Sequence, residues 1–279
     1  MRAMTAGAPL RPTLLSIAGS DPSGGAGVQA DLKTCAAFGA YGMAAVTALT
    51  VQNTKGVLKV APVSAALVAE QIDAIFDDVA VDAVKIGMLA RPSTARAVAD
   101  SLQRAGAQTI VLDPVLRASH GAALSAAGLP RAILMHLAPL ATLITPNLAE
   151  AATLTGTALA RDVQDMQAQA RALVVVGAKA ALVKGGHLDG APIDVLCAHG
   201  ATRVFHGERV ETRNTHGTGC ALSSAIACLM ARGLNLEAAI EEAKRWLTQA
   251  LAAGAKMRLG AGAGPPDHLW SDDCPSASV

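Results

Sequence analysis

The segment Asn214–Cys220 has the residue types of an anion-binding loop placed beside a proton acceptor. Gly217 and Gly219 let the backbone turn tightly so that successive N–H groups converge, and the apolar helical segment 221–231 adds its positive dipole end. Cys220 would lie in the first helical turn, where the dipole favours the thiolate. An anion site and a base together predict phosphoryl transfer to a hydroxyl group. The alternative is a glycine-rich helix start with a buried, inert cysteine.

The composition of the 279-residue chain excludes several classes of partner. Hydrophobic residues make up 52% of it, enough for a sizeable core, whereas charged residues make up 16% and the net charge is +1. No basic field is available to hold nucleic acid or an anionic membrane surface, so we expect small neutral or zwitterionic ligands. The cysteines are odd in number and lack C-x-x-C spacing, which predicts reduced thiols in a cytoplasmic protein. They are Cys35, Cys197, Cys220, Cys228 and Cys274.

Strand-like and helix-like segments alternate along the chain, which predicts an α/β fold with a mainly parallel sheet and helices on both faces. The charge-free run 34–54 approaches membrane-spanning length, but its glycines and polar residues indicate a helix end, a turn and a buried strand. We expect one domain over 14–270, an N-terminal extension over 1–13 and a disordered tail over 271–279. Predicted strands cover 14–18, 44–51, 83–86, 109–112, 141–144 and 180–183, with a hairpin of 195–198 and 202–206. Predicted helices cover 28–38, 67–79, 93–105, 126–137, 148–154, 163–176, 221–231 and 236–257.

A glycine-rich loop, Gly19–Gly27, follows the first predicted strand. Ligands of such sheets bind beyond the carboxyl ends of the strands, so residues directly after each strand are candidates for the site. The loop nearly matches P-loop spacing, but Gly25 stands where lysine is required and Ala26 where a hydroxyl is required. We therefore expect its glycines to let the backbone approach a substrate closely. An elaborate turn is the alternative.

Four polar residues follow later strands and complete the candidate site. Asp113 and Glu150 would place carboxylates where a magnesium–nucleotide would lie. Asn147 and Glu150 also have the spacing of a helix N-cap and its reciprocal partner, so a purely structural capping box is the alternative. Lys184, which precedes two glycines, would supply a mobile positive charge. A lone lysine at a strand end is usually only solvated. Lys184 becomes a candidate for the site because the other candidates follow strands at the same edge of the sheet.

The combination of these motifs resembles the hydroxymethylpyrimidine/phosphomethylpyrimidine kinases of thiamine biosynthesis, within the ribokinase-like superfamily. The resemblance spans roughly residues 14–270 and implies a three-layer α/β/α sandwich. It also implies two successive ATP-dependent phosphorylations, first of the hydroxymethyl group of 4-amino-5-hydroxymethyl-2-methylpyrimidine and then of the resulting monophosphate. Most sugar kinases of the superfamily have Asp at the position of Cys220. The segments that carry the resemblance are Ala18–Gly27, Gln29–Thr34, Lys85–Leu89, Thr145–Asn147, Lys184–His187 and Asn214–Cys220.

The resemblance assigns roles to individual residues. Gln52 is placed against the substrate ring, which makes physical sense because a carboxamide answers both the ring nitrogen and the amino group of an aminopyrimidine. Asp31 is expected to bond the substrate near its hydroxymethyl arm, with an exposed helix carboxylate paired to a lysine as the alternative. The remaining assignments are Gly19, Met88 and Val115 at the substrate, Lys184, Thr218 and Asn147 at the nucleotide, Asp113 and Glu150 at Mg²⁺, and Gly217, Thr218, Gly219 and Cys220 in catalysis.

Two other functions stay open at the level of sequence. A pyridoxal or pyridoxine kinase could use the same scaffold, because a cysteine thiol adds reversibly to an aldehyde; Gln52 favours the aminopyrimidine. A non-catalytic pyrimidine-binding protein would tolerate loss of the anion loop and the base, and both are present. We expect a homodimer.

Overall fold

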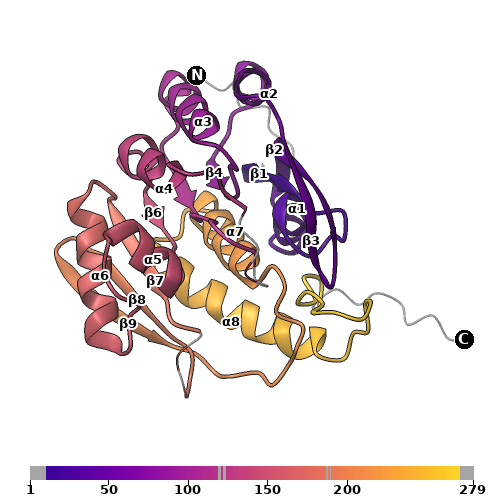
Figure 1. The fold of residues 1–279 in the computed structure, drawn as a ribbon, viewed down its shortest axis with the longest axis vertical. Coiled ribbons are helices and arrows are strands. Elements are labelled where there is room, and N and C mark those ends of the chain that lie inside the picture. Colours follow the sequence, from indigo (N-terminus) through magenta and orange to yellow (C-terminus); the bar gives the residue numbers. More distant parts are fainter. Residues whose placement is uncertain (1–10, 119–120, 122–123, 187, 189, 271–279) are drawn as a thin grey trace, which may run out of the picture.

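The computed structural model describes residues 11–270 except 119–120, 122–123, 187 and 189. Its strands form one nine-stranded sheet in the order β3-β2-β1-β4-β5-β6-β7-β8-β9. Helices pack on both faces of this sheet, as Figure 1 shows. The predicted three-layer α/β/α sandwich is confirmed.

The elements follow each other along the chain in the alternation expected from the sequence. The strands are β1 (Thr13–Ser20), β2 (Tyr41–Asn53), β3 (Gly56–Pro62), β4 (Ala83–Ile86), β5 (Ile110–Leu112), β6 (Leu143–Ile144), β7 (Ala180–Lys184), β8 (Ile193–Ala198) and β9 (Ala201–His206). The helices are α1 (Gly27–Ala37), α2 (Ala65–Asp78), α3 (Pro92–Ala105), α4 (Leu129–Ala132), the π-helical turn η1 (Ile133–Leu137), α5 (Leu148–Thr155), α6 (Val163–Val175), α7 (Thr218–Ala231) and α8 (Leu236–Gly254).

Two apolar cores lie on the two faces of the sheet because successive side chains of a strand point in opposite directions. Leu15 and Ile17 of β1 belong to the core that α2, α3, α4, α5 and α6 cover. Leu14 belongs to the other core, which α1, α7 and α8 cover. Alanines on α7, namely Ala221, Ala225 and Ala227, allow this helix to pack closely against both α1 and α8.

The central strands β2, β1, β4, β5, β6 and β7 run parallel, so their carboxyl ends share one edge of the sheet. The antiparallel partners lie outside this group, with β3 beyond β2 and the hairpin β8–β9 beyond β7. This arrangement places the β1–α1 loop, the ends of β5, β6 and β7 and the start of α7 around one site.

Some predicted boundaries were wrong. The edge strand β3 was not predicted, because 56–62 is half exposed, lacks alternation and ends in Pro62. The single helix expected over 126–137 is the short helix α4 followed by the π-helical turn η1. Helix α7 begins at Thr218, earlier than predicted. Among the described residues, no helix is long and apolar enough to cross a membrane. The tail 271–279 and residues 1–10 of the extension lie outside the described residues.

Candidate active site

The loop before α7 forms the centre of the candidate site. Gly217 is the N-cap of α7, with a φ of 77°, and a Cβ on it would lie 1.8 Å from the carbonyl oxygen of Gly25. Only glycine therefore lets this loop pack against the β1–α1 loop. Thr218, Gly219 and Cys220 make up the first turn of α7, whose N–H groups have no acceptor within the helix. The amide of Thr218 donates to the Thr215 carbonyl at 3.3 Å, and the anion cradle at this turn stays a prediction.

Lys184 and Asp113 form the charged side of the site. The Nζ of Lys184 lies 2.7 Å from Oδ1 of Asp113, whose side chain also lies 3.3 Å from the hydroxyl of Thr145. A Cβ on Gly219 would lie 3.2 Å from the lysine nitrogen and 3.7 Å from an Asp113 oxygen, so this pair adjoins the first turn of α7. Burial alone would lower the pKa of Lys184, but Asp113 and Glu150 outweigh it and raise that pKa. The lysine is therefore a cation at neutral pH.

Cys220 lies in the first turn of α7 as expected, but its protonation state differs from the prediction. Burial raises the pKa of the Cys220 thiol to about 11, against the opposing effect of the Lys85 ammonium. Asp31 and Asp113 raise it further, whereas a hydrogen bond from the backbone of Gly27 lowers it. The prediction that the first helical turn favours the thiolate is therefore not supported, because burial raises the pKa of this thiol well above neutral pH.

Asn147 and Glu150 form the capping box that the sequence left open as the structural alternative. The side chain of Asn147 accepts from the Glu150 backbone at 2.9 Å, and the Glu150 carboxylate accepts from the Asn147 backbone at 2.9 Å. Glu150 is nevertheless close to the charged pair, because Lys184 and Asp113 both influence its titration. Burial raises the pKa of Glu150 to about 7, with Lys184 opposing and Asp113 reinforcing the shift. Among the described residues, no group of three or more His, Cys, Asp or Glu could hold a metal ion by itself.

Gln52 stands on β2, which is separated in the sheet from the strand β7 of Lys184 by β1, β4, β5 and β6, and it belongs to a hydrogen-bonded network. Its Nε2 is placed 3.1 Å from Nε2 of His216, the residue directly before Gly217. The same His216 nitrogen lies 2.8 Å from the Asp21 carboxylate in the β1–α1 loop. His216 and Asp21 were not predicted as site residues, although both stand inside the two glycine-rich motifs. A histidine directly before the first glycine of the anion loop was the available signal in the sequence.

The residues expected to form an apolar wall come together near Gly19. Met88 packs with Ala48 and Ala90 in a small cluster that Val115 borders. A Cβ on Gly19 would lie 3.0 Å from the sulfur of Met88, so the glycine leaves space beside the methionine. The structure thus brings Gly19, Met88 and Val115 to one region, next to the strand that carries Gln52.

Asp31 does not face this site. Its side chain and that of Lys85 are both 0% exposed, and the lysine nitrogen lies 2.9 Å from each Asp31 oxygen. The hydroxyls of Ser16 and Ser224 donate to the same carboxylate at 2.5 and 2.7 Å. The prediction that Asp31 bonds the substrate is therefore not supported, and neither is the alternative of an exposed helix carboxylate. Asp31 is a buried ion-pair partner that joins α1, β1, β4 and α7.

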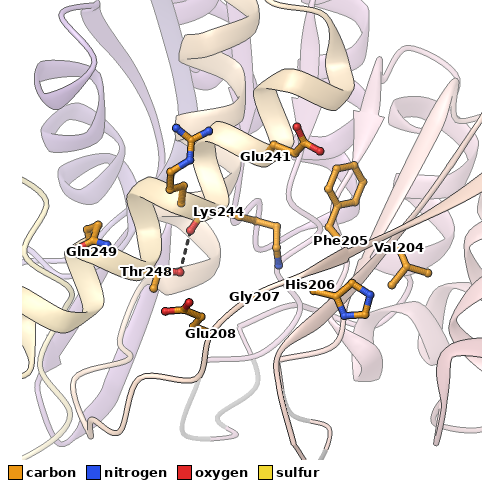
Figure 2. A pocket seen from close by; sticks show the side chains of 10 residues that line it. Val204, Phe205, His206, Gly207, Glu208, Glu241, Lys244, Thr248 and Gln249 are labelled. Carbon is orange, nitrogen blue, oxygen red and sulfur yellow. Dashed lines mark hydrogen bonds between the residues drawn. The ribbon is translucent and has the colours of Figure 1, made fainter.

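A cavity of about 550 Å³ opens between β9 and α8. Figure 2 shows Lys244 of α8 reaching toward Gly207, with Glu208 and Gln249 on the side of Thr248. Lys244 forms an ion pair with Asp194. Asp194 of β8 lies opposite Lys184 of β7 in the antiparallel pair of these strands, and its side chain accepts a hydrogen bond from the Gly185 backbone at 3.0 Å. The cavity is thus connected to the end of β7. Sequence reasoning missed it because its residues are scattered over a hairpin and a helix.

Comparisons with known proteins agree with this geometry. The family model described as phosphomethylpyrimidine kinase matches residues 21–267. A hydroxymethylpyrimidine/phosphomethylpyrimidine kinase of Rhizobium meliloti is 50% identical over 262 residues, which cover 92% of this chain and 98% of the relative. An ADP complex of Bacillus subtilis pyridoxal kinase has a TM-score of 0.86 at 34% identity, covering 94% of this chain and 99% of that one. Phosphomethylpyrimidine kinase from Clostridium difficile has a TM-score of 0.77 at 38% identity, covering 86% and 99%.

The fold and the site define a small-molecule kinase with a ribokinase-like architecture. Within that class, the chain belongs to the phosphomethylpyrimidine kinase family.

Proposed function

We propose that the protein uses ATP to phosphorylate the hydroxymethyl group of 4-amino-5-hydroxymethyl-2-methylpyrimidine, and then the resulting monophosphate, in thiamine biosynthesis. The observation that carries this proposal is the position of the first turn of α7 between two unlike groups. The Lys184–Asp113 pair adjoins it on one side, and Gln52 reaches it through His216 on the other. A nucleotide and an alcohol bound on these two sides would meet at the anion cradle. The family and the activity named for the Rhizobium meliloti relative support the same reaction.

The acceptor side is suited to a small heteroaromatic alcohol. The Gln52 carboxamide can offer one donor and one acceptor to the ring nitrogen and amino group of the pyrimidine. Met88 and Val115 offer apolar contact, and Gly19 leaves space for the ring to approach the backbone. The proposal places the ring there, with its hydroxymethyl oxygen toward Cys220.

The phosphoryl group would be transferred at the first turn of α7. The backbone amides of Gly217–Cys220 would stabilise the negative charge of the transferring group. Lys184 and Thr218 would hold the nucleotide phosphates, with Asn147 beside them. Cys220 would accept the proton of the attacking hydroxyl, and its pKa of about 11 makes it a strong base once deprotonated.

Asp113 and Glu150 fit a magnesium site in part. Burial and, to a smaller extent, Asp113 raise the pKa of Glu150 although Lys184 opposes them, so a further cation at this position would favour the ionised carboxylate. Mg²⁺ keeps several waters when it binds phosphates, so it does not need a complete protein cage. When bound, the ion would neutralise charge that develops on the phosphate oxygens.

The nucleotide base would occupy the cavity between β9 and α8. This cavity is of a size typical for small-molecule sites and is connected to Lys184 through Asp194. With the phosphates at Lys184, the base would extend away from the acceptor side. The two substrates would then approach the anion cradle from opposite directions.

The test is a substrate panel with coupled detection of ADP. The purified protein is supplied with ATP, Mg²⁺ and either the pyrimidine alcohol, its monophosphate or pyridoxal. The proposal expects ADP release with both pyrimidines and lower kcat/KM with pyridoxal. ADP release that requires pyridoxal and fails with both pyrimidines would contradict it.

A pyridoxal kinase is the second candidate because the structural similarity to pyridoxal kinase of Bacillus subtilis is high. The same panel decides between the two, since pyridoxal lacks the amino group beside a ring nitrogen. The network around Gln52 supports the aminopyrimidine.

We also propose that the protein is a homodimer in the cytoplasm. Apolar side chains of the edge hairpin β2–β3 are exposed, namely Leu49 (57%), Val51 (52%) and Leu58 (77%). Burial of this surface against a second copy would remove it from water. Light scattering of wild type and Leu58→Lys checks the dimer: the wild type should have the mass of two chains and the variant that of one. The described cysteines are free thiols, which agrees with a reducing compartment.

A further inference from the structure

His216 joins three segments that are far apart in the sequence. Its Nε2 lies 2.8 Å from Oδ2 of Asp21 in the β1–α1 loop and 3.1 Å from the carboxamide of Gln52 on β2. The side chains of His216 and Asp21 are 7% and 4% exposed, so little water competes for these contacts. His216 and Asp21 are buried and Gln52 is half-buried, so these three closely held polar groups must match each other as donors and acceptors.

The partners of Asp21 determine where the His216 proton lies. The Asp21 carboxylate accepts from Ser23 at 2.9 Å (backbone) and 2.7 Å (hydroxyl), and from the Gly25 and Ala26 backbones at 3.2 and 2.9 Å. Burial alone would raise the pKa of Asp21, but the bonds from His216 and Ser23 outweigh it and lower that pKa. An ionised carboxylate only accepts hydrogen bonds, so the His216 nitrogen facing it at 2.8 Å must carry a proton.

A protonated His216 Nε2 cannot accept a hydrogen bond from the NH₂ group of Gln52. The group of Gln52 that faces His216 must therefore be its carbonyl oxygen. The oxygen and nitrogen of a carboxamide have nearly the same shape, and their assignment follows from the hydrogen-bond network. The Gln52 amide is accordingly turned by 180° from an arrangement in which Nε2 faces the histidine.

Thr50 leads to the same orientation independently. Its hydroxyl lies 3.0 Å from the Ser20 carbonyl oxygen and 3.2 Å from the other end of the Gln52 carboxamide. The single hydroxyl proton is used by the Ser20 carbonyl, which can only accept. The Gln52 group beside Thr50 must then be a donor, and this is the NH₂ group. One chain of hydrogen bonds then runs from the Ser20 carbonyl through Thr50, Gln52 and His216 to Asp21, with the single Nε2 proton of His216 shared between the Asp21 carboxylate and the Gln52 oxygen.

We propose that the Asp21–His216 pair is the positioning element that fixes the orientation of the Gln52 carboxamide and thereby selects an acceptor ring with a nitrogen acceptor beside an amino donor. In this orientation one N–H and one oxygen lone pair of Gln52 remain for a ligand. A ring nitrogen would accept from that N–H, and an exocyclic amino group would donate to that oxygen. This inference rests on the proposed function for the identity of the ligand, but the orientation of the network does not depend on it.

The first test measures protonation directly in the wild-type protein without ligand. Nitrogen-15 NMR of selectively labelled histidine distinguishes a protonated from an unprotonated Nε2. We expect His216 Nε2 to carry a proton in the wild type, with a coupling across its hydrogen bond to Asp21. In Asp21→Asn we expect the signal of this proton to be lost. An unprotonated Nε2 in the wild type would overturn the proposal. This result is independent of whether the protein is a kinase for the pyrimidine.

The second test uses kinetics with His216→Phe, which keeps a ring in the same volume and removes the hydrogen bonds. KM for the pyrimidine alcohol should rise about tenfold, with kcat and KM for ATP nearly unchanged. The preference for the alcohol over an analogue lacking the amino group should fall by a similar factor. Equal KM values for His216→Phe and wild type would overturn the proposal.

A double-mutant cycle separates positioning from a general loss of structure. In the background of Gln52→Ala, His216→Phe should raise KM no further, because its effect acts through Gln52. Additive effects would contradict the proposal.

The control variant is His199→Asn. His199 lies in the β8–β9 turn, at the opposite end of the sheet from the site, and its φ of 51° is one that Asn tolerates. Wild-type protein that turns over neither pyrimidine would refute the proposed function, whereas the NMR result would still test the network.

Discussion

Two lysine–aspartate pairs lie at the carboxyl ends of parallel strands, and they have opposite roles. Lys85 and Asp31 are 0% exposed and are enclosed by the hydroxyls of Ser16 and Ser224. Lys184 and Asp113 are 13% and 3% exposed and border the first turn of α7. The first pair joins elements, whereas the second, whose lysine is partly exposed, is the one that we propose binds the nucleotide. A lysine at a strand end therefore becomes a binding group only where the surrounding packing leaves it accessible.

The largest effect should come from breaking the enclosed pair. Asp31→Ala leaves the Lys85 ammonium buried without a partner, and we expect a loss of about 3–5 kcal/mol in the free energy of unfolding. Urea denaturation measures this loss. The control is Asp73→Ala, which breaks the exposed pair with Arg104 and should change stability by about 0–1 kcal/mol. Similar effects of both substitutions would contradict the distinction between enclosed and accessible pairs.

Cys220 lies between the two pairs, since charges from both influence its thiol. Cys220→Ala should lower kcat by about 10²–10⁴-fold while both substrates still bind. Cys197→Ala, a change at a buried cysteine of β8, is the control and should keep kcat. Near-wild-type kcat at saturating substrates would show that Cys220 only packs.

The pH dependence gives a separate test of the same residue. A base must be deprotonated to act, and the Cys220 thiol has a pKa of about 11, so the reactive form becomes more abundant as pH rises. We expect kcat/KM for the alcohol to increase from pH 7 to pH 10. A flat profile in the wild type, or the same upward slope in Cys220→Ala, would exclude this thiol as the titrating base.

A substitution in the accessible pair should impair the use of ATP more than it lowers the stability of the fold. Lys184→Gln keeps a donor for Asp113 but removes the charge, so kcat/KM for ATP should fall about 10–100-fold. Calorimetric titration with the pyrimidine alone should give nearly the wild-type affinity, and stability should change less than in Asp31→Ala. Equal weakening of both ligands would mean that Lys184 is structural.

Glu150 should give the smallest effect. Glu150→Gln keeps the capping box, because glutamine also accepts from the N-cap backbone, and removes the charge beside Asp113. If Glu150 helps to hold Mg²⁺, the concentration of Mg²⁺ needed for half-maximal activity should rise about tenfold with unchanged thermal stability. An unchanged Mg²⁺ requirement would leave Glu150 with its capping role alone.

Sequence reasoning was accurate where a residue's role depends on local spacing. The strand Ala83–Ile86, the hairpin around His199 and the N-cap of α5 at Asn147 follow from short patterns of apolar, glycine and capping residues. The edge strand β3 lacked such a pattern, because an exposed edge does not require alternation. The apolar pattern of the segment that forms the π-helical turn η1 is that of an ordinary amphipathic helix, so the sequence does not reveal the π-helical turn.

Roles that depend on burial could not be predicted in the same way. Asp31 is enclosed because β1 and α7 bring the hydroxyls of Ser16 and Ser224 to its carboxylate, which the local sequence around Asp31 does not reveal. The protonation of Cys220 likewise depends on the desolvation that packing imposes. His216 was visible inside its motif, but its partners Asp21 and Gln52 are brought to it only by the folded sheet.

The most direct test of the account compares kcat/KM for the pyrimidine alcohol, its monophosphate and pyridoxal in wild type and Gln52→Met. Loss of the carboxamide leaves the ring nitrogen and the amino group without protein partners, at a cost of about 1–3 kcal/mol for each unpaired group. The alcohol should lose most, and the monophosphate less because its phosphate keeps charge-assisted contacts at the anion cradle. A wild-type preference for pyridoxal, or a variant that loses nothing on the alcohol, would contradict the assignment of the acceptor site.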